Sequence, residues 1–227
     1  MSESYIVNNE KKHLIWDVPT RVFHWSIVLL IAYSWYSVEI AEDMDQHFIS
    51  GYCVLTLLIF RILWGFVGTY YATFKSMLYK PSDILGYTRS LFSKKTGHYP
   101  GHNPLGSLSV FALLGLLLLQ AVSGLFSNDE DYYFGPLSDY VSTKISDRIT
   151  EIHHLNFDIL TVIIATHILA ILFYLLFKKD NLVTAMISGR KLLESGSDKI
   201  VENSKLLIAL LTLILSASAV SLLVYFA

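Results

Sequence analysis

The sequence predicts an all-α membrane protein whose helices cross the bilayer five times, and three observations predict this fold class. Hydrophobic residues fill 53% of the 227 positions and charged residues only 16%, a balance too apolar for a soluble domain of this length. Five apolar segments are long enough to span a bilayer, which takes about 20 residues. Short connections join them, and only helices or closed barrels satisfy backbone polar groups in lipid, so a helical bundle is expected.

In chain order, the predicted spans are residues 21–38, 47–68, 106–126, 151–177 and 205–226. Asn103 stands just before the third span, where its side chain can cap the helix. The fifth span contains no histidine and no charge beyond Lys205. Two longer connections, one following Pro81 and one over residues 180–195, have the mixed composition of short helices that lie at a membrane surface.

The positively charged residues predict the orientation. Of the 17 Lys and Arg residues, Lys144 and Arg148 lie in a connection on one side, Arg61 lies inside the second span, and the other fourteen fall on the opposite side. Lys and Arg are retained in the cytoplasm, so we expect a cytoplasmic N-terminus. After an odd number of spans the C-terminus is then expected on the outer, periplasmic side.

Composition also excludes several kinds of partner and attachment. A net charge of -2 leaves no basic face that could neutralise a phosphate backbone, so nucleic acid is not expected as a partner. The single cysteine, Cys53, excludes an intramolecular disulfide and covalent attachment of a c-type haem. Membrane lipid is the partner that composition predicts.

Four histidines lie in or beside the predicted spans at two matching depths. His47 opens the second span and His153 opens the fourth, both near the outer membrane face. His24 in the first span and His167 in the fourth lie about fourteen residues deeper, roughly 21 Å along a helix. Fourteen helical steps return to nearly the same face, so His153 and His167 share a face, whereas His154 points elsewhere and is expected beside the site.

A histidine within a span is costly unless it faces the bundle interior and has a partner. For one isolated histidine, a hydrogen bond between helices is an equally good explanation. With four at two depths, we expect the pairs His47–His153 and His24–His167. Two imidazoles that face each other across a bundle can hold the metal of one planar macrocycle from both sides. Two such sites would form a relay across most of the hydrocarbon.

Neighbouring residues are suited to large flat ligands that carry acidic groups. Gly51, one turn after the second-span histidine, leaves room for a ring. Arg61 is predicted to lie near the inner pair, where a haem propionate would be a charge-assisted partner; snorkelling to the membrane boundary is the alternative. Arg21 is either a second partner of this kind or an interface anchor. His102, in the loop GHNPLG, either approaches an inner propionate or a quinone headgroup or belongs to a structural turn.

Several motifs together resemble the bacterial cytochrome b561 family. They are WDVPTRVFHW at 16–25, HFISGYCVLTLLIFRILWGFVG in the second span, GHNPLG at 101–106, DNLVTAMISGRK at 180–191, and the spacing of His153 and His167. The resemblance covers about residues 14–191. The family is related to the b-type cytochrome subunits of nickel–iron hydrogenases and formate dehydrogenases.

The resemblance implies a transmembrane four-helix haem-binding bundle, to which this chain adds a fifth C-terminal transmembrane helix. It implies two non-covalent haem b groups whose axial metal ligands are His24, His47, His153 and His167. The chain then divides into a cytoplasmic N-terminal tail (1–20), a four-helix dihaem core (21–177), a cytoplasmic linker (178–204) and the fifth transmembrane helix (205–227).

We therefore expect electron transfer in the bacterial inner membrane, between the quinone pool and a periplasmic redox partner such as a c-type cytochrome or a hydrogenase-like enzyme. Quinone would be a substrate, and whether the chain itself acts as a quinone oxidoreductase is left open. Three alternatives stay open: oxidation of superoxide or another small oxidant, a haem-free histidine-lined transporter, and a membrane anchor whose haems mainly stabilise a larger complex. The acidic outer loops weigh against an anionic substrate.

Overall fold

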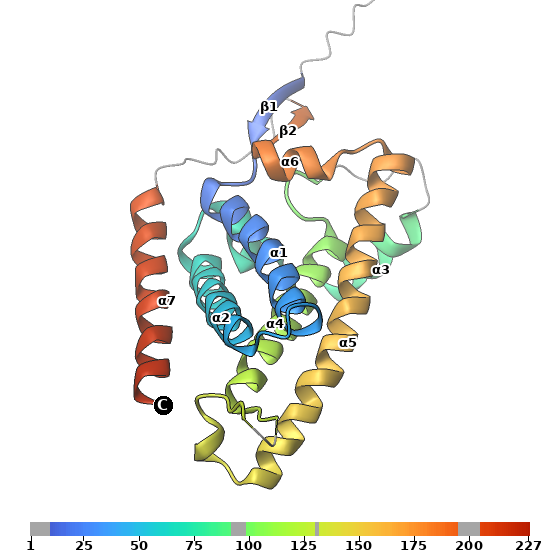
Figure 1. Cartoon of the computed structure of the whole chain (residues 1–227). Coiled ribbons are helices and arrows are strands. Elements are labelled where there is room, and N and C mark those ends of the chain that lie inside the picture. The colour runs from blue at the N-terminus through green and yellow to red at the C-terminus, as the bar shows by residue number, and fades with distance from the viewer. Residues whose placement is uncertain (1–9, 92–98, 130–131, 195–204) are drawn as a thin grey trace, which may run out of the picture.

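The computed structural model describes the chain apart from residues 1–9, 92–98, 130–131 and 195–204, and the described part is mostly helical (Figure 1). The long helices are α1 (Val18–Glu39), α2 (Met44–Val67), α4 (Pro104–Phe126), α5 (Thr143–Phe173) and α7 (Leu206–Phe226). The remaining elements are α3 (Pro81–Ser90), α6 (Leu182–Ser188), three 3-10 turns (Tyr70–Ala72, Phe74–Met77, Ser138–Tyr140), a π-helical extension of α5 (Tyr174–Lys178), and strands β1 (Glu10–Leu14) and β2 (Arg190–Glu194). Helices α3 and α6 occupy the two connections where short helices are predicted.

Four of the described helices are long and apolar enough to cross a membrane: α2, α4, α5 with its extension, and α7. They coincide with the second to fifth predicted spans, which confirms those four. The first predicted span forms α1, which has 22 residues but does not reach the same apolarity. Its aliphatic run is interrupted by His24 and by several Tyr, Trp and Ser side chains. A fifth crossing, by α1, stays a proposal.

Local signals explain where several helices begin. At the start of α1, Asp17 accepts a hydrogen bond from a backbone N–H of the first turn at 2.7 Å. Asn103 accepts the equivalent bond at 2.8 Å at the start of α4, as predicted. Helix α5 begins earlier than the predicted span, at Thr143 instead of residue 151. Hydropathy marks only the part of a helix that fits the hydrocarbon, and the charged turns before it are helical as well.

Helix α2 lies at the centre of the bundle. It contacts α1, α4 and α7, and its apolar segment is the most deeply buried of the four candidate spans. Leu58 and Trp64 of α2 pack in one core cluster with Phe23 of α1, Leu117 of α4 and Leu160 of α5. Close van der Waals packing stabilises such contacts in lipid, where exclusion of water contributes little.

Helix α7 runs along the side of α2 (Figure 1). Lys205 donates hydrogen bonds to the backbone carbonyls of Val67 and Gly68 at 2.9 and 2.6 Å, so it caps the last turn of α2. Small side chains let the two backbones approach each other. The buried residues of α7 are Ala209, Thr212, Ser216 and Val220.

A two-stranded antiparallel sheet, which the sequence does not predict, joins segments from opposite ends of the chain. Strand β1 pairs with β2, with Leu14 opposite Arg190. The sheet lies beside α6 at the end of the bundle where α1 starts and α5 ends (Figure 1). We call this the sheet end, and the opposite end, where the chain passes from α4 to α5, the loop end.

The sheet involves two of the predicted domains. The described parts of the predicted tail (1–20) and linker (178–204) pair with each other through β1 and β2. Residues 1–9 and 195–204 of these two segments lie outside the described part of the chain. The two strands are far apart in the sequence, so no local sequence pattern predicts that they pair.

Candidate functional site

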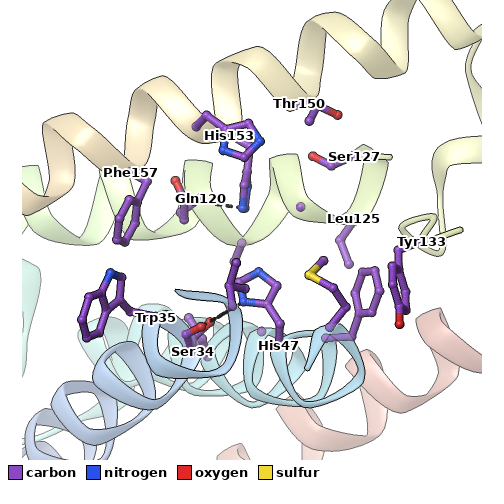
Figure 2. Close-up of a pocket in the computed structure, with 18 of the residues that line it drawn as sticks. Ser34, Trp35, His47, Gln120, Leu125, Ser127, Tyr133, Thr150, His153 and Phe157 are labelled. Atoms are coloured by element: carbon purple, nitrogen blue, oxygen red, sulfur yellow. Dashed lines mark hydrogen bonds between the residues drawn. The ribbon is translucent and has the colours of Figure 1, made fainter. Parts of the chain in front are cut away.

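A cavity of about 340 Å³ lies between α1, α2, α4 and α5 toward the loop end (Figure 2). Most of its wall is apolar or aromatic and includes Trp35, Leu125 and Phe157. His47 of α2 and His153 of α5 line it from opposite sides, and both are half-buried. The structure therefore brings the outer predicted pair together.

The spacing of these two imidazoles suits a metal held between them. Their ring centres lie 6.4 Å apart, with the ring planes 87° apart. A metal–imidazole bond of about 2 Å, with roughly 1 Å more from each nitrogen to its ring centre, places two axial rings about 6 Å apart. The two histidines and the cavity between them fit a planar macrocycle.

Each imidazole is held by a neighbouring helix. Nδ1 of His47 lies 3.1 Å from both the carbonyl and the hydroxyl oxygen of Ser34 on α1. Nδ1 of His153 lies 3.0 Å from Oγ of Ser123, and its Nε2 lies 3.0 Å from Nε2 of Gln120, both on α4. The sequence alone does not identify these partners, because uncharged polar residues are common in membrane helices and nothing in their spacing sets them apart.

Two glycines shape the cavity. Apart from its chain neighbours and the backbone of its own helix, a Cβ added at Gly51 would meet none of the described heavy atoms within 4 Å, so this part of the cavity wall is open. A Cβ at Gly124 would lie 3.1 Å from Cε1 of His153. Gly124 thus lets α4 approach the imidazole closely, and it is one reason why the ring can occupy this position.

A second group of polar residues surrounds His102, toward the sheet end. Burial, and then the positive charges of Arg61, His167 and His24, lower the pKa of His102 to about 3, so its imidazole is neutral. These four predicted residues are therefore near one another. Among the described residues, Nδ1 of His24 and Nδ1 of His102 are buried without a hydrogen-bond partner. Unpaired buried nitrogens of this kind suit a bound group that supplies their hydrogen-bond partners.

Arg61 of α2 is buried within the bundle. Its side chain is 3% exposed, and within the described chain its buried Nη1 has no hydrogen-bond partner. Its guanidinium carbon lies 5.2 Å from the ring centre of Phe74, a cation–π contact. A buried guanidinium with an unused donor fits the carboxylate of a haem propionate.

Arg21 lies elsewhere, at the junction of α1 and α6. Its Nη1 donates to the carbonyl oxygen of Ile187 at 2.6 Å. With Trp25 and Leu29 it lines an open groove on the outer surface of the bundle. This position favours an anchor at the membrane boundary over contact with a buried ligand.

The ring of His102, by contrast, lies inside the sheet end, where its centre is 4.6 Å from the ring centre of Trp16.

Asp17 is a central residue that sequence reasoning missed. It is 1% exposed, and it accepts hydrogen bonds from Trp64 Nε1 at 3.1 Å and from Thr69 Oγ1 at 2.6 Å, besides capping α1. One carboxylate thus connects α1, the end of α2 and the segment that follows it. The available signal was an aspartate directly before Val-Pro, which marks a helix start but not its buried partners.

A tyrosine cluster at the sheet end was missed as well. The hydroxyls of Tyr87 and Tyr174 form a hydrogen bond, and the Asn103 amide donates to the Tyr174 hydroxyl at 3.0 Å. Burial, with help from this bond, raises the pKa of Tyr87, which keeps it protonated. The cluster links α3, the start of α4 and the π-helical end of α5, and so stabilises the helix ends near His102.

Comparison with known proteins agrees with the resemblance seen in the sequence. The sequence model of the family described as prokaryotic cytochrome b561 matches residues 15–189, a range that contains every predicted site residue. No solved structure matches the chain.

Similar proteins carry related names. The probable Ni/Fe-hydrogenase B-type cytochrome subunit of Rhizobium leguminosarum bv. viciae is 24% identical over 220 residues, which cover 81% of this chain and 90% of that protein. The protein of the same name from Azotobacter chroococcum mcd 1 is 23% identical over 209 residues, 77% of this chain and 86% of that protein. The probable Ni/Fe-hydrogenase 1 B-type cytochrome subunit of Escherichia coli (strain K12) is 21% identical over 215 residues, 80% of this chain and 92% of that protein.

Proposed function

Because the chain belongs to the prokaryotic cytochrome b561 family, we propose that it carries electrons across a bacterial inner membrane through two haem b groups, between the quinone pool and a periplasmic redox partner. Membership of the family implies a multi-pass membrane protein that binds haem b and transfers electrons. The number of haems, their ligands, the orientation and the partner are parts of the proposal.

The observation that carries the proposal is the pair of imidazoles 6.4 Å apart across the His47–His153 cavity. A haem b held by these residues would supply one-electron redox chemistry. Ser34 orients one imidazole and Ser123 the other, and the apolar wall limits access of water. The hydrogen bonds that hold both imidazoles would keep the reorganisation on electron transfer small.

We assign the second haem to His24 and His167, toward the sheet end. Arg61 and His102 would contact its propionates. The support is the convergence of these residues and the unpaired buried nitrogens of His24, Arg61 and His102. The two sites lie at different depths on α5, because the two histidines of that helix are about four turns apart.

The proposed orientation in the membrane follows from the distribution of Lys and Arg, and the proposed redox partner follows from the names of similar proteins. The excess of Lys and Arg assigns the sheet end to the cytoplasm and the C-terminus to the periplasm. Glu39 and Asp129 at the mouth of the cavity then face the periplasm, where a redox protein exchanges electrons with the outer haem. The names of the relatives suggest a hydrogenase-like enzyme as that partner. The division of the chain into a tail (1–20), a dihaem core (21–177), a linker (178–204) and a fifth transmembrane helix (205–227) is also part of this proposal.

Haem content and redox titration test the proposed function. The purified full-length protein is expected to contain two haems b per chain and to show sharp b-type bands in its reduced-minus-oxidised spectrum. Both haems are expected to be reduced by a quinol within one turnover. A colourless protein would favour the histidine-lined transporter, and haems that quinol never reduces would favour the anchor. Reduction by superoxide and not by quinol would favour the small-oxidant alternative.

Replacing the buried arginine tests the inner site. Arg61→Ala is expected to lower the midpoint potential of the inner haem and to weaken its retention by about tenfold or more, because a charge-assisted hydrogen bond of roughly 1.5–3 kcal/mol is lost. Redox titration and haem-to-protein ratio measure both effects. Arg148→Ala, at an exposed position on the loop end, is the control and should change neither. An unchanged titration of Arg61→Ala would reject its role as a propionate partner.

A further inference from the structure

A hydrogen-bond network surrounds His153 at the interface of α4 and α5. Nδ2 of Asn156 faces the carbonyl oxygen of Leu116 at 3.0 Å and Oε1 of Gln120 at 2.6 Å. Nε2 of Gln120 faces Nε2 of His153 at 3.0 Å. Nδ1 of His153 faces Oγ of Ser123 at 3.0 Å, and that hydroxyl donates to the backbone carbonyl of Gln120 at 3.1 Å. Both ends of the network are backbone carbonyls, which only accept hydrogen bonds.

The first carbonyl determines how the two amides are oriented. The Asn156 group that faces the carbonyl of Leu116 must be its NH₂, because two oxygens would repel each other. The same NH₂ requires an oxygen from Gln120, so Gln120 turns its own NH₂ toward His153. The imidazole nitrogen Nε2 must then accept, which means that Nε2 carries the lone pair and Nδ1 carries the proton.

The second carbonyl leads independently to the same protonation. The hydroxyl of Ser123 has one proton, and this proton goes to the carbonyl of Gln120. Its oxygen is left to accept from the imidazole, so Nδ1 of His153 must be the protonated nitrogen. On the other side of the cavity, Nδ1 of His47 faces the carbonyl of Ser34 and must also carry the proton. Both histidines therefore have Nε2 in the unprotonated form that binds a metal.

We propose that Gln120 is a positioning residue of the His47–His153 site: aligned by Asn156, its amide keeps Nε2 of His153 unprotonated at the cavity until a haem iron takes that nitrogen. Figure 2 shows Gln120 and His153 joined at the wall of the cavity that both line. Asn156 is only 3% exposed, so water does not compete for the alignment. This inference rests on the proposed haem at this site, and it adds a group that selects the tautomer before the haem arrives.

Two substitutions at one position separate this role from simple packing. Gln120→Glu keeps the shape, but an ionised carboxylate only accepts hydrogen bonds, so it favours a proton on Nε2, the nitrogen that has to bind the metal. We expect the outer haem to be retained about 10- to 100-fold less tightly, as is typical when a partner of a metal ligand is altered. Gln120→Leu removes the amide without imposing a tautomer. Ser123 alone then fixes the proton, so Gln120→Leu should retain the outer haem less tightly than the wild type but more tightly than Gln120→Glu.

The measurement uses the haem-loaded, full-length protein in detergent. Transfer of haem to an excess of apomyoglobin gives the retention of each haem, and low-spin electron paramagnetic resonance identifies the outer haem as the signal that His47→Ala removes. The inner haem is the internal standard and should not change. Wild-type retention in either variant, or equal loss in both, would overturn the positioning role alone. A wild-type protein without an outer haem would overturn the proposed function first, and this role with it.

Discussion

His47→Ala and His153→Ala are each expected to remove the same haem, and His24→Ala and His167→Ala are each expected to remove the other. One imidazole cannot hold the iron from both sides, so every variant should retain about one haem per chain. Electron transfer from quinol to an outer acceptor should fall by more than about 100-fold, since losing a ligand exceeds the 10- to 100-fold effect of altering its hydrogen-bond partner.

Haem-to-protein ratio and redox titration of the remaining haem measure this result. His154→Ala is the matched control, because His154 also lines the cavity, with its ring 6.1 Å from that of His153, but lies on an exposed face of α5. It should retain both haems. If His24→Ala and His153→Ala removed the same haem, the assignment of the histidines to two sites would be wrong.

Asp17→Ala is expected to lower the free energy of unfolding by about 2.5–8 kcal/mol. The substitution removes the cap of α1, typically worth about 0.5–2 kcal/mol. It also leaves the buried indole N–H of Trp64 and the hydroxyl of Thr69 without their acceptor, at about 1–3 kcal/mol each. Equilibrium unfolding of the detergent-solubilised protein, followed by circular dichroism, measures the loss.

A second capping aspartate provides the control for this experiment. Asp43 caps α2 by accepting a hydrogen bond from the Gln46 backbone N–H at 3.0 Å, but it is exposed, and within the described part of the chain its carboxylate accepts no bond from another helix. Asp43→Ala should therefore cost about 1 kcal/mol. If the two variants were equally stable, the buried bonds of Asp17 would contribute nothing, and the link between α1 and the end of α2 would have to come from packing alone.

Much of the architecture could be predicted because it depends on local patterns. Long apolar runs identify α2, α4, α5 and α7, and Asn103 marks the start of α4. The start of α5 could not be predicted in the same way, since its first turns are polar and lie beyond the part that hydropathy detects. The sheet was missed because β1 and β2 are far apart in the sequence and each is too short to be recognised alone.

In the candidate site, too, helical spacing predicted some features and not others. Helical spacing placed His153 and His167 on one face, and counting residues from the membrane surface matched His47 with His153, whose rings the structure places 6.4 Å apart. For Arg61 the sequence predicted only that a buried guanidinium needs a charged partner, and not its contact with the ring of Phe74. That Arg21 lies at an outer groove, away from the cavity, could not be distinguished from the sequence, because both positions suit an arginine near a membrane boundary.

The amino-acid sequence by itself determined the membrane class, four of the spans and the depths of the histidines, because hydropathy and helical spacing are properties of single segments. Only the tertiary structure decided which groups hold the imidazoles of His47 and His153. Ser34, Gln120 and Ser123 act on imidazoles of other helices, and Asp17 joins segments about fifty residues apart. Hydrogen bonds of this kind depend on distances of about 3 Å between helices, and such distances exist only after the helices have packed.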